Sequence, residues 1–232
     1  GKRFLHIMAD GERAIWMSER TGWNHLDLID LTTGERRPLT SGDWVVRAVD
    51  EVDESKGTIR IRLMGIDPDQ DPYHVHHATI SIADGSMTRL TSGDGTHELE
   101  FSPDGEYYID RWSRVDRPPV HELRRGSDGG LVTTLATADH ARLLETGWQE
   151  PERFVAKGRD GETDIWGVIV RPSDFDPTKT YPVVEHIYAG PHGHFVPKSF
   201  ARRWRMREIA DLGFVVVQID GMGTNWRSKA FH

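Results

Sequence analysis

The 232-residue sequence contains no cysteine. This excludes disulfides, thiolate nucleophiles and cysteine-based zinc sites. No apolar run reaches the roughly 18 residues that a membrane-spanning helix needs. No apolar segment follows the first residues, as it would in a signal peptide. The net charge is −8 and the basic residues are scattered. Because no basic stripe is present, nucleic acid is not an expected partner.

The residues that are present can build a packed core. Apolar residues make up 37% of the chain and include eight tryptophans, which is incompatible with a disordered polymer. Residues 26–31, 58–63 and 78–82 alternate between apolar and polar side chains. This period of two is typical of half-buried antiparallel strands. Asp-Gly pairs between these segments favour tight turns.

A short repeat divides the first part of the chain. The segment 38–43 (Pro-Leu-Thr-Ser-Gly-Asp) recurs at 89–94 (Arg-Leu-Thr-Ser-Gly-Asp), 51 residues later. A period of roughly 40–50 residues with several strands in each unit is typical of a β-propeller. We therefore predict three C-terminal blades of a propeller within residues 1–137, at 1–43, 44–94 and 95–137. The two copies should occupy equivalent places in adjacent blades.

From residue 138 onward the pattern changes to that of an α/β domain. Apolar strands are predicted at 153–157, 164–170, 182–187 and 214–220, and an amphipathic helix at 199–212. Trp204, Ile209 and Leu212 would form the apolar side of this helix, and Gly213 would cap its C-terminus. The nearly continuous Val/Ile content of strand 214–220 predicts a buried parallel sheet. We expect this strand to lie at an exposed edge of that sheet.

Several motifs in the same order give the chain a family resemblance. Residues 188–191 (Tyr-Ala-Gly-Pro) follow one strand, and residues 221–223 (Gly-Met-Gly) follow the next. This pattern resembles the dipeptidyl peptidase IV branch of the prolyl oligopeptidase family. The segments 16–23, 101–105 and 113–119 resemble its propeller, while 195–200 and 227–232 resemble its bacterial members. The resemblance implies that residues 138–232 are the N-terminal part of an α/β-hydrolase peptidase domain, in an internal fragment of a longer protein.

The same resemblance implies a serine-type peptidase that releases N-terminal dipeptides, often Xaa-Pro, from peptides. Tyr188 matches the family tyrosine whose hydroxyl stabilises the oxyanion. No Gly-x-Ser-x-Gly occurs, and Ser127 has the wrong spacing, so the nucleophile, base and orienting acid are not assigned to this chain. We therefore expect residues 1–232 alone to be inactive. Neither cofactor nor metal is required, and the substrate-binding residues stay unknown.

Other interpretations remain open. Tyr188 could be an aromatic residue at a strand end that packs on the core. The rival function is a non-catalytic propeller module that binds peptides or proteins; within the enzyme class, an acylaminoacyl peptidase or oligopeptidase is the alternative. The resemblance allows a homodimeric parent. The location of the parent protein is undetermined, with a periplasmic or secreted one favoured over a cytoplasmic one.

A few further side chains invite a functional interpretation. His74 and His76 could share a strand face and bind a metal, although we favour a plain blade strand. Residues 67–71 have calcium-loop spacing, but the required glycine and glutamate are missing, so we favour a solvated loop. His192 and His194 could line an active-site mouth, but we favour solvated loop residues. Met222 stands where many relatives carry arginine, and its role is open.

Overall fold

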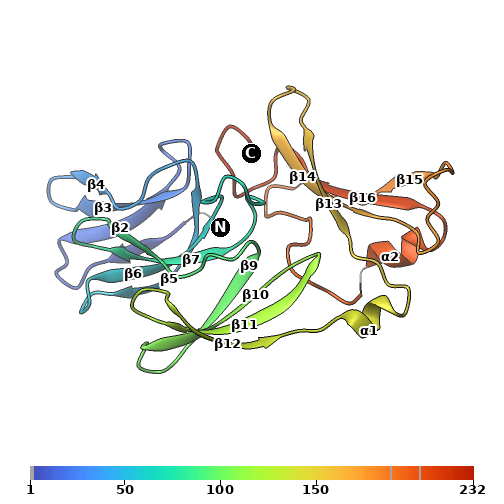
Figure 1. The fold of residues 1–232 in the computed structure, drawn as a ribbon. Helices are drawn as coiled ribbons and strands as arrows, with labels where there is room; N and C mark the ends of the chain where they lie inside the picture. The colour runs from blue at the N-terminus through green and yellow to red at the C-terminus, as the bar shows by residue number, and fades with distance from the viewer. Residues whose placement is uncertain (1–2, 189, 204) are drawn as a thin grey trace.

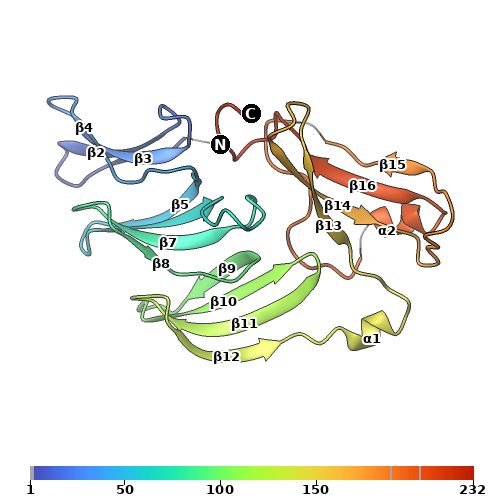
Figure 2. The same cartoon turned by 45° about the horizontal axis from the view of Figure 1, so that its top comes forward.

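The structure is a computed structural model that describes residues 3–188, 190–203 and 205–232. It consists of three four-stranded sheets followed by a fourth (Figure 1). Figure 2 shows the first three sheets arranged one after another as a fan, with the fourth sheet to one side.

Each of the first three sheets is an antiparallel meander of consecutive strands. The first contains β1 (Leu5–Ile7), β2 (Arg13–Ser18), β3 (His25–Asp30) and β4 (Arg36–Pro38). The second contains β5 (Val45–Asp53), β6 (Thr58–Met64), β7 (His76–Ser81) and β8 (Met87–Arg89). The third contains β9 (Thr96–Phe101), β10 (Tyr107–Arg114), β11 (Arg117–Arg125) and β12 (Leu131–Thr137). These are the blades of a β-propeller, as predicted.

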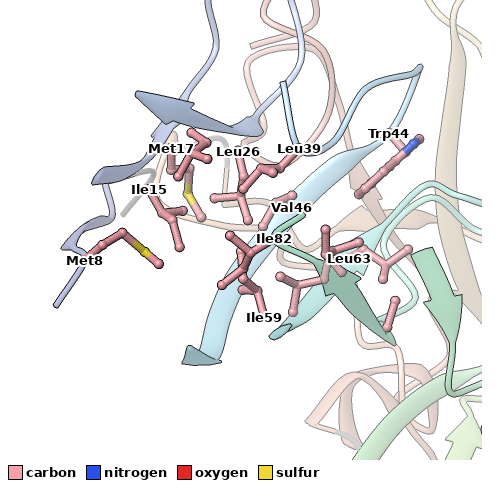
Figure 3. Close-up of a cluster of buried hydrophobic side chains, with 14 residues drawn as sticks. Met8, Ile15, Met17, Leu26, Leu39, Trp44, Val46, Ile59, Leu63 and Ile82 are labelled. Carbon is pink, nitrogen blue, oxygen red and sulfur yellow. The ribbon is translucent and has the colours of Figure 1, made fainter. Parts of the chain in front are cut away.

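An apolar core joins the first two blades (Figure 3). On β6 the alternation is clear, since Ile59, Ile61 and Leu63 are fully buried while the intervening arginines are not. The first blade supplies Ile15 and Leu26 to the same cluster. One face of each sheet is therefore buried against its neighbour, which is the packing that a period of two requires.

The repeated segments occupy equivalent places in the first two blades. Thr40 follows β4, and its Oγ1 accepts a hydrogen bond from the Leu26 N–H at 2.9 Å. Thr91 follows β8, and its Oγ1 accepts one from the His77 N–H at 3.0 Å. In both blades a histidine Nδ1 also lies against the threonine hydroxyl, His25 at 3.0 Å and His76 at 3.1 Å. The repeat thus ties the outermost strand to its neighbour.

The fourth sheet has mixed topology. It contains β13 (Glu152–Lys157), β14 (Asp164–Val170), β15 (Val183–Glu185) and β16 (Val215–Asp220), in the spatial order β13-β14-β16-β15. Only the pair β15–β16 is parallel. Among the described residues there are two short helices, α1 (Ala141–Leu144) and α2 (Arg205–Ala210). The helix α2 lies between β15 and β16 in sequence, as a crossover between parallel strands requires.

Two expectations about this sheet were wrong. The strand 214–220 does not lie at the sheet edge, because β15 pairs with it through the register Val183↔Val215. Nor is the sheet a fully buried parallel one: β16 pairs antiparallel with β14 and buries only alternate residues. The edge strands are β13 and β15, and Val183 of β15 is 65% exposed.

The predicted helix 199–212 is shorter than expected. Its buried residues are Met206 and Ala210, whereas Leu212 is 77% exposed; Trp204 lies outside the described residues. Phe200, which was expected in the helix, is not helical. Its N–H donates to Ser113 Oγ of the third blade at 3.2 Å. The C-cap was predicted correctly. Gly213 has φ +97° and its N–H donates to the Ala210 carbonyl at 2.8 Å, as in an αL cap.

We predict that Thr40→Val and Thr91→Val each lower the free energy of unfolding by roughly 1–3 kcal/mol, because each leaves a buried backbone N–H without its acceptor. The measurement is urea unfolding of the purified chain. The exposed Thr32→Val is the control and should change little. Unequal effects of Thr40→Val and Thr91→Val, with one of them neutral, would contradict structural equivalence.

Candidate functional site

Tyr188 lies three residues after the edge strand β15 and is not a core residue, since it is 43% exposed. Its ring centroid is 5.5 Å from that of Phe195. A Cβ added at Gly190 would collide with the Tyr188 ring and hydroxyl. A side chain at this position would have to displace the Tyr188 ring, because the backbone passes close to it. Ala189, the other member of the motif, lies outside the described residues.

Phe195 supports Tyr188 and is fixed on both sides of its backbone. Its N–H donates to Asp220 Oδ1 at 2.6 Å, and its carbonyl accepts from Gln218 Nε2 at 2.8 Å. Its ring also contacts His186, with the centroids 4.9 Å apart. Gln218 and Asp220 belong to β16, so the loop that carries Tyr188 is attached to the carboxyl end of a central strand. This attachment restricts where the Tyr188 ring can lie.

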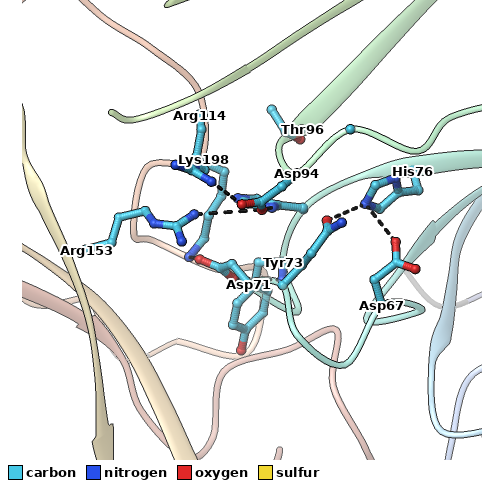
Figure 4. A network of polar contacts seen from close by, with 12 residues as sticks. Asp67, Asp71, Tyr73, His76, Asp94, Thr96, Arg114, Arg153 and Lys198 are labelled. Atoms are coloured by element: carbon cyan, nitrogen blue, oxygen red, sulfur yellow. Dashed lines mark hydrogen bonds and ion pairs between the residues drawn. The ribbon is translucent and has the colours of Figure 1, made fainter. Parts of the chain in front are cut away.

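A buried lysine continues this attachment to the propeller. Lys198 Nζ lies 2.8 Å from Asp71 Oδ2 and 3.6 Å from Asp220 Oδ2. The relative exposures are 6% for Lys198, 7% for Asp71 and 2% for Asp220. Burial tends to raise the pKa of Asp71, but the Lys198 ammonium and then His74 outweigh it and hold that pKa below its usual value. Figure 4 shows Lys198 reaching toward Asp71 and Tyr73.

The interpretation of residues 67–71 as a solvated loop was therefore wrong for its last residue. Pro68 and Asp69 are exposed, but Asp71 turns inward to a partner 127 positions away. The same loop also supports the blade, because Asp67 forms an ion pair with Arg89 at 2.9 Å. The carboxylates of Asp67 and Asp71 therefore bind protein groups.

A second ion cluster lies beside the first (Figure 4). Arg114, at the end of β10, is paired with Asp94 and donates to Asp116 Oδ1 at 2.6 Å. Arg153 of β13 approaches both carboxylates, at 3.9 and 3.8 Å. The approach of His74, whose Nδ1 lies 3.4 Å from Asp94 Oδ1, is the main cause that lowers the pKa of Asp94 to about 2, and Arg114 contributes further against the effect of burial. This cluster joins the second and third blades to the fourth sheet.

Trp226 joins the C-terminal segment to the second blade through apolar contacts. It is 2% exposed and packs in a cluster with Val45, Met64 and Tyr73. The Arg47 guanidinium lies 3.8 Å from its ring centroid. Within the described ranges it is the one non-glycine residue with a positive φ, +70°. Such a conformation costs on the order of 1–3 kcal/mol and persists only where the surroundings enforce it.

The histidines of the second blade have protein partners. The strand β7 begins at His76, so His74 does not share its face. Besides Thr91, His76 contacts Gln70 Oε1 through Nε2 at 3.0 Å. His77 Nε2 lies 3.3 Å from the His97 carbonyl. Among the residues that the structure describes, no three His, Asp or Glu side chains are grouped to hold a metal ion.

The two loop histidines differ. His192 is exposed, as a solvated loop residue would be. His194 is partly buried: its ring centroid is 5.3 Å from that of Tyr73, and its pKa is lowered by burial and by the nearby Lys198. Met222 is 52% exposed.

Sequence reasoning missed Asp71, Lys198 and Asp220. A signal existed for Asp220 alone, because an acid at the carboxyl end of an apolar strand is an unusual buried residue. Asp71 was considered only within the loop 67–71 and Lys198 only within the motif 195–200, and neither segment indicates a pairing between residues 127 positions apart.

Three antiparallel blades followed by a mixed sheet define the class as a propeller protein with a second structural unit. Residues 2–119 match the family described as Dipeptidyl peptidase IV (DPP IV) N-terminal region. The chain belongs to this family. In the described part of the chain, none of the helices is long and apolar enough to cross a membrane.

Individual relatives agree with this assignment. Human dipeptidyl peptidase 8 is 28% identical over 207 residues, which cover 85% of this chain and 23% of that protein. A probable dipeptidyl-aminopeptidase B of Emericella nidulans is 29% identical over 217 residues, covering 90% of this chain and 23% of that protein. The crystal structure of Porphyromonas gingivalis dipeptidyl peptidase 4 superposes with a TM-score of 0.76 and 28% identity, covering 98% of this chain and 31% of that one. The chain thus spans about a quarter to a third of these proteins.

The buried histidines predict a loss of stability in acid. Burial is the main cause that lowers the pKa of His76 to about 3 and that of His77 to about 4, from 6.5. Between about pH 6.5 and 4 the unfolded chain binds more protons than the folded one, so the free energy of unfolding should fall as the pH falls through this window. His77→Gln should make this decrease shallower in urea unfolding at a series of pH values.

The matched control is His232→Gln at an exposed position, which should keep the wild-type pH dependence. A His77→Gln variant with an unchanged slope would show that His77 does not titrate differently in the folded chain.

Proposed function

We propose that this chain is the junction between the propeller and the catalytic domain of a serine-type dipeptidyl peptidase, with Tyr188 as oxyanion donor. The observation that carries the proposal is the support of Tyr188: an exposed ring on Phe195, whose backbone is bound by Asp220 and Gln218 of β16. A family member that acts on peptides needs such a fixed donor. The proposed substrates are peptides that lose an N-terminal dipeptide, often Xaa-Pro.

The chemistry explains why a rigid donor is useful. When a serine attacks a peptide carbonyl, negative charge develops on the carbonyl oxygen. A hydroxyl fixed beforehand at that position stabilises the charge without reorganising in the transition state. The nucleophile would be the serine of a Gly-x-Ser-x-Gly motif, and the proton acceptor would follow that serine in the sequence. In this proposal residues 138–232 are the N-terminal part of an α/β-hydrolase domain, and the parallel pair β15–β16 with its crossover α2 supports that assignment.

In the full-length peptidase, we predict that Tyr188→Phe lowers kcat by roughly 10- to 1000-fold with little change in KM, because one oxyanion donor is lost. The measurement is steady-state hydrolysis of an Xaa-Pro chromogenic amide. Tyr107→Phe is the matched control, since Tyr107 is 42% exposed on a blade strand and should keep wild-type kinetics.

An unchanged kcat in Tyr188→Phe would make Tyr188 a packing residue. A full-length protein that binds peptides but does not hydrolyse them would favour the non-catalytic binding module instead.

We also predict that residues 1–232, purified alone, hydrolyse no Xaa-Pro amide, because the sequence has no Gly-x-Ser-x-Gly motif and the loss of triad members lowers activity by orders of magnitude. The assay is the same, at high protein concentration. Turnover that copurifies with the chain and is abolished by Tyr188→Phe would contradict this.

A further inference from the structure

Lys198 is a buried charge in the loop that carries Tyr188. Its two carboxylate partners come from different parts of the fold: Asp71 precedes β7 in the second blade, and Asp220 ends β16. Apolar residues of similar volume would often join two such parts at least as stably. A buried ion triad fixes direction and distance, which an apolar contact does not.

The contacts lead from Lys198 to Tyr188 in short steps. The Asp220 carboxylate that Lys198 approaches at 3.6 Å also accepts the N–H groups of Phe195, at 2.6 Å, and Val196, at 3.2 Å. The Phe195 ring in turn contacts Tyr188. The ammonium therefore orients the carboxylate that holds the support of Tyr188. Removing it leaves two buried carboxylates without their cation.

The other end of the triad is fixed in the propeller. Asp71 Oδ1 accepts the Tyr73 N–H at 2.9 Å. Tyr73 is fully buried, and its ring lies 4.9 Å from Lys198 Nζ and packs against His194. The connection before β7 is thereby rigid where Lys198 meets it. A displacement of the second blade would move the cation and, through Asp220, the loop.

We propose that Lys198 is a positioning residue that sets the location of the Tyr188 hydroxyl relative to the propeller. The Asp71–Lys198–Asp220 triad couples the second blade to the loop 188–200. This inference rests on the proposed function of Tyr188 as oxyanion donor. Lys198 itself touches no substrate in this proposal and acts through Asp220 and Phe195.

The first test is kinetic, in the full-length peptidase. Lys198→Met removes the charge while keeping most of the length, and should lower kcat by roughly 10- to 100-fold with little change in KM, because displacement of a catalytic group by about 1 Å has such an effect. Lys198→Arg should restore part of the activity. Asp71→Asn should show the same split between kcat and KM. Lys179→Met, at a side chain that is 68% exposed, is the control.

A double-mutant comparison separates positioning from general support of the fold. In a Tyr188→Phe background, Lys198→Met should cause little further loss of kcat, because no hydroxyl remains to be misplaced. An equal loss in both backgrounds would overturn the proposal. If Lys198→Met does not fold, Lys198→Arg and Asp71→Asn are compared in the same two backgrounds, and equal losses there would overturn it too.

Hydrogen exchange gives a readout that does not depend on activity. Lys198→Met should speed exchange in peptides containing Phe195 and Val196, whose N–H groups bind Asp220, and leave β6 protected. Unchanged exchange at these two amides would contradict the proposal even if activity fell. If instead Tyr188→Phe keeps full kcat while exchange at Phe195 rises in Lys198→Met, the proposed role of Tyr188 fails and the hold of Lys198 on the loop stands.

Discussion

The buried triad of Asp71, Lys198 and Asp220 is the contact on which the position of the Tyr188 loop relative to the second blade depends. Each member is at most 7% exposed, and the Nζ–Oδ2 separation of 2.8 Å to Asp71 leaves no room for water between the charges. Loss of one partner in such a group is strongly destabilising, because the other charges remain buried. Apolar residues in place of the whole triad would often be equally stable. The triad therefore contributes a fixed direction and distance between the two parts more than it contributes net stability.

The interfaces between blades differ in chemistry. The first two blades share an apolar core, which tolerates small shifts because apolar contacts have no preferred direction. Between the second and third blades, the His76 ring packs against that of His97 at an interplanar angle of 38°, and His97 stacks on Trp112. His97 Nδ1 lies 2.9 Å from the buried Asp110, and its Nε2 lies 2.9 Å from the Gly93 carbonyl. Between the blades, the His97 N–H donates to the Val75 carbonyl at 2.9 Å, and His77 Nε2 lies 3.3 Å from the His97 carbonyl. These directional contacts restrict the angle between the second and third blades.

The sequence alone predicted the structural features that are determined by local pattern. Alternation in 58–63 and the repeated Leu-Thr-Ser-Gly-Asp identified the blades, because strand period and turn position are set by neighbours in the chain. The helix 199–212 was overestimated since Phe200 is bound to Ser113 of the third blade, a tertiary effect that overrides propensity. The order β14-β16-β15 and the pairing of Asp71 with Lys198 join residues far apart, so no spacing in the sequence encodes them. Tyr188 was found only through its motif, and its role stays a prediction.

Two contacts of different kinds attach the part of the chain after β15 to the second blade. Trp226 packs on Val45 and Met64, and Lys198 meets Asp71, although the third blade is nearer in sequence. The third blade contributes its own contacts, with Val115 in the apolar cluster of the fourth sheet and Asp116 against Arg153. The fourth sheet thus straddles two blades. The segment after Tyr188 is also held from both blades, by Asp71 of the second through Lys198 and by Ser113 of the third through Phe200. A change in the angle between these blades would therefore act directly on this segment.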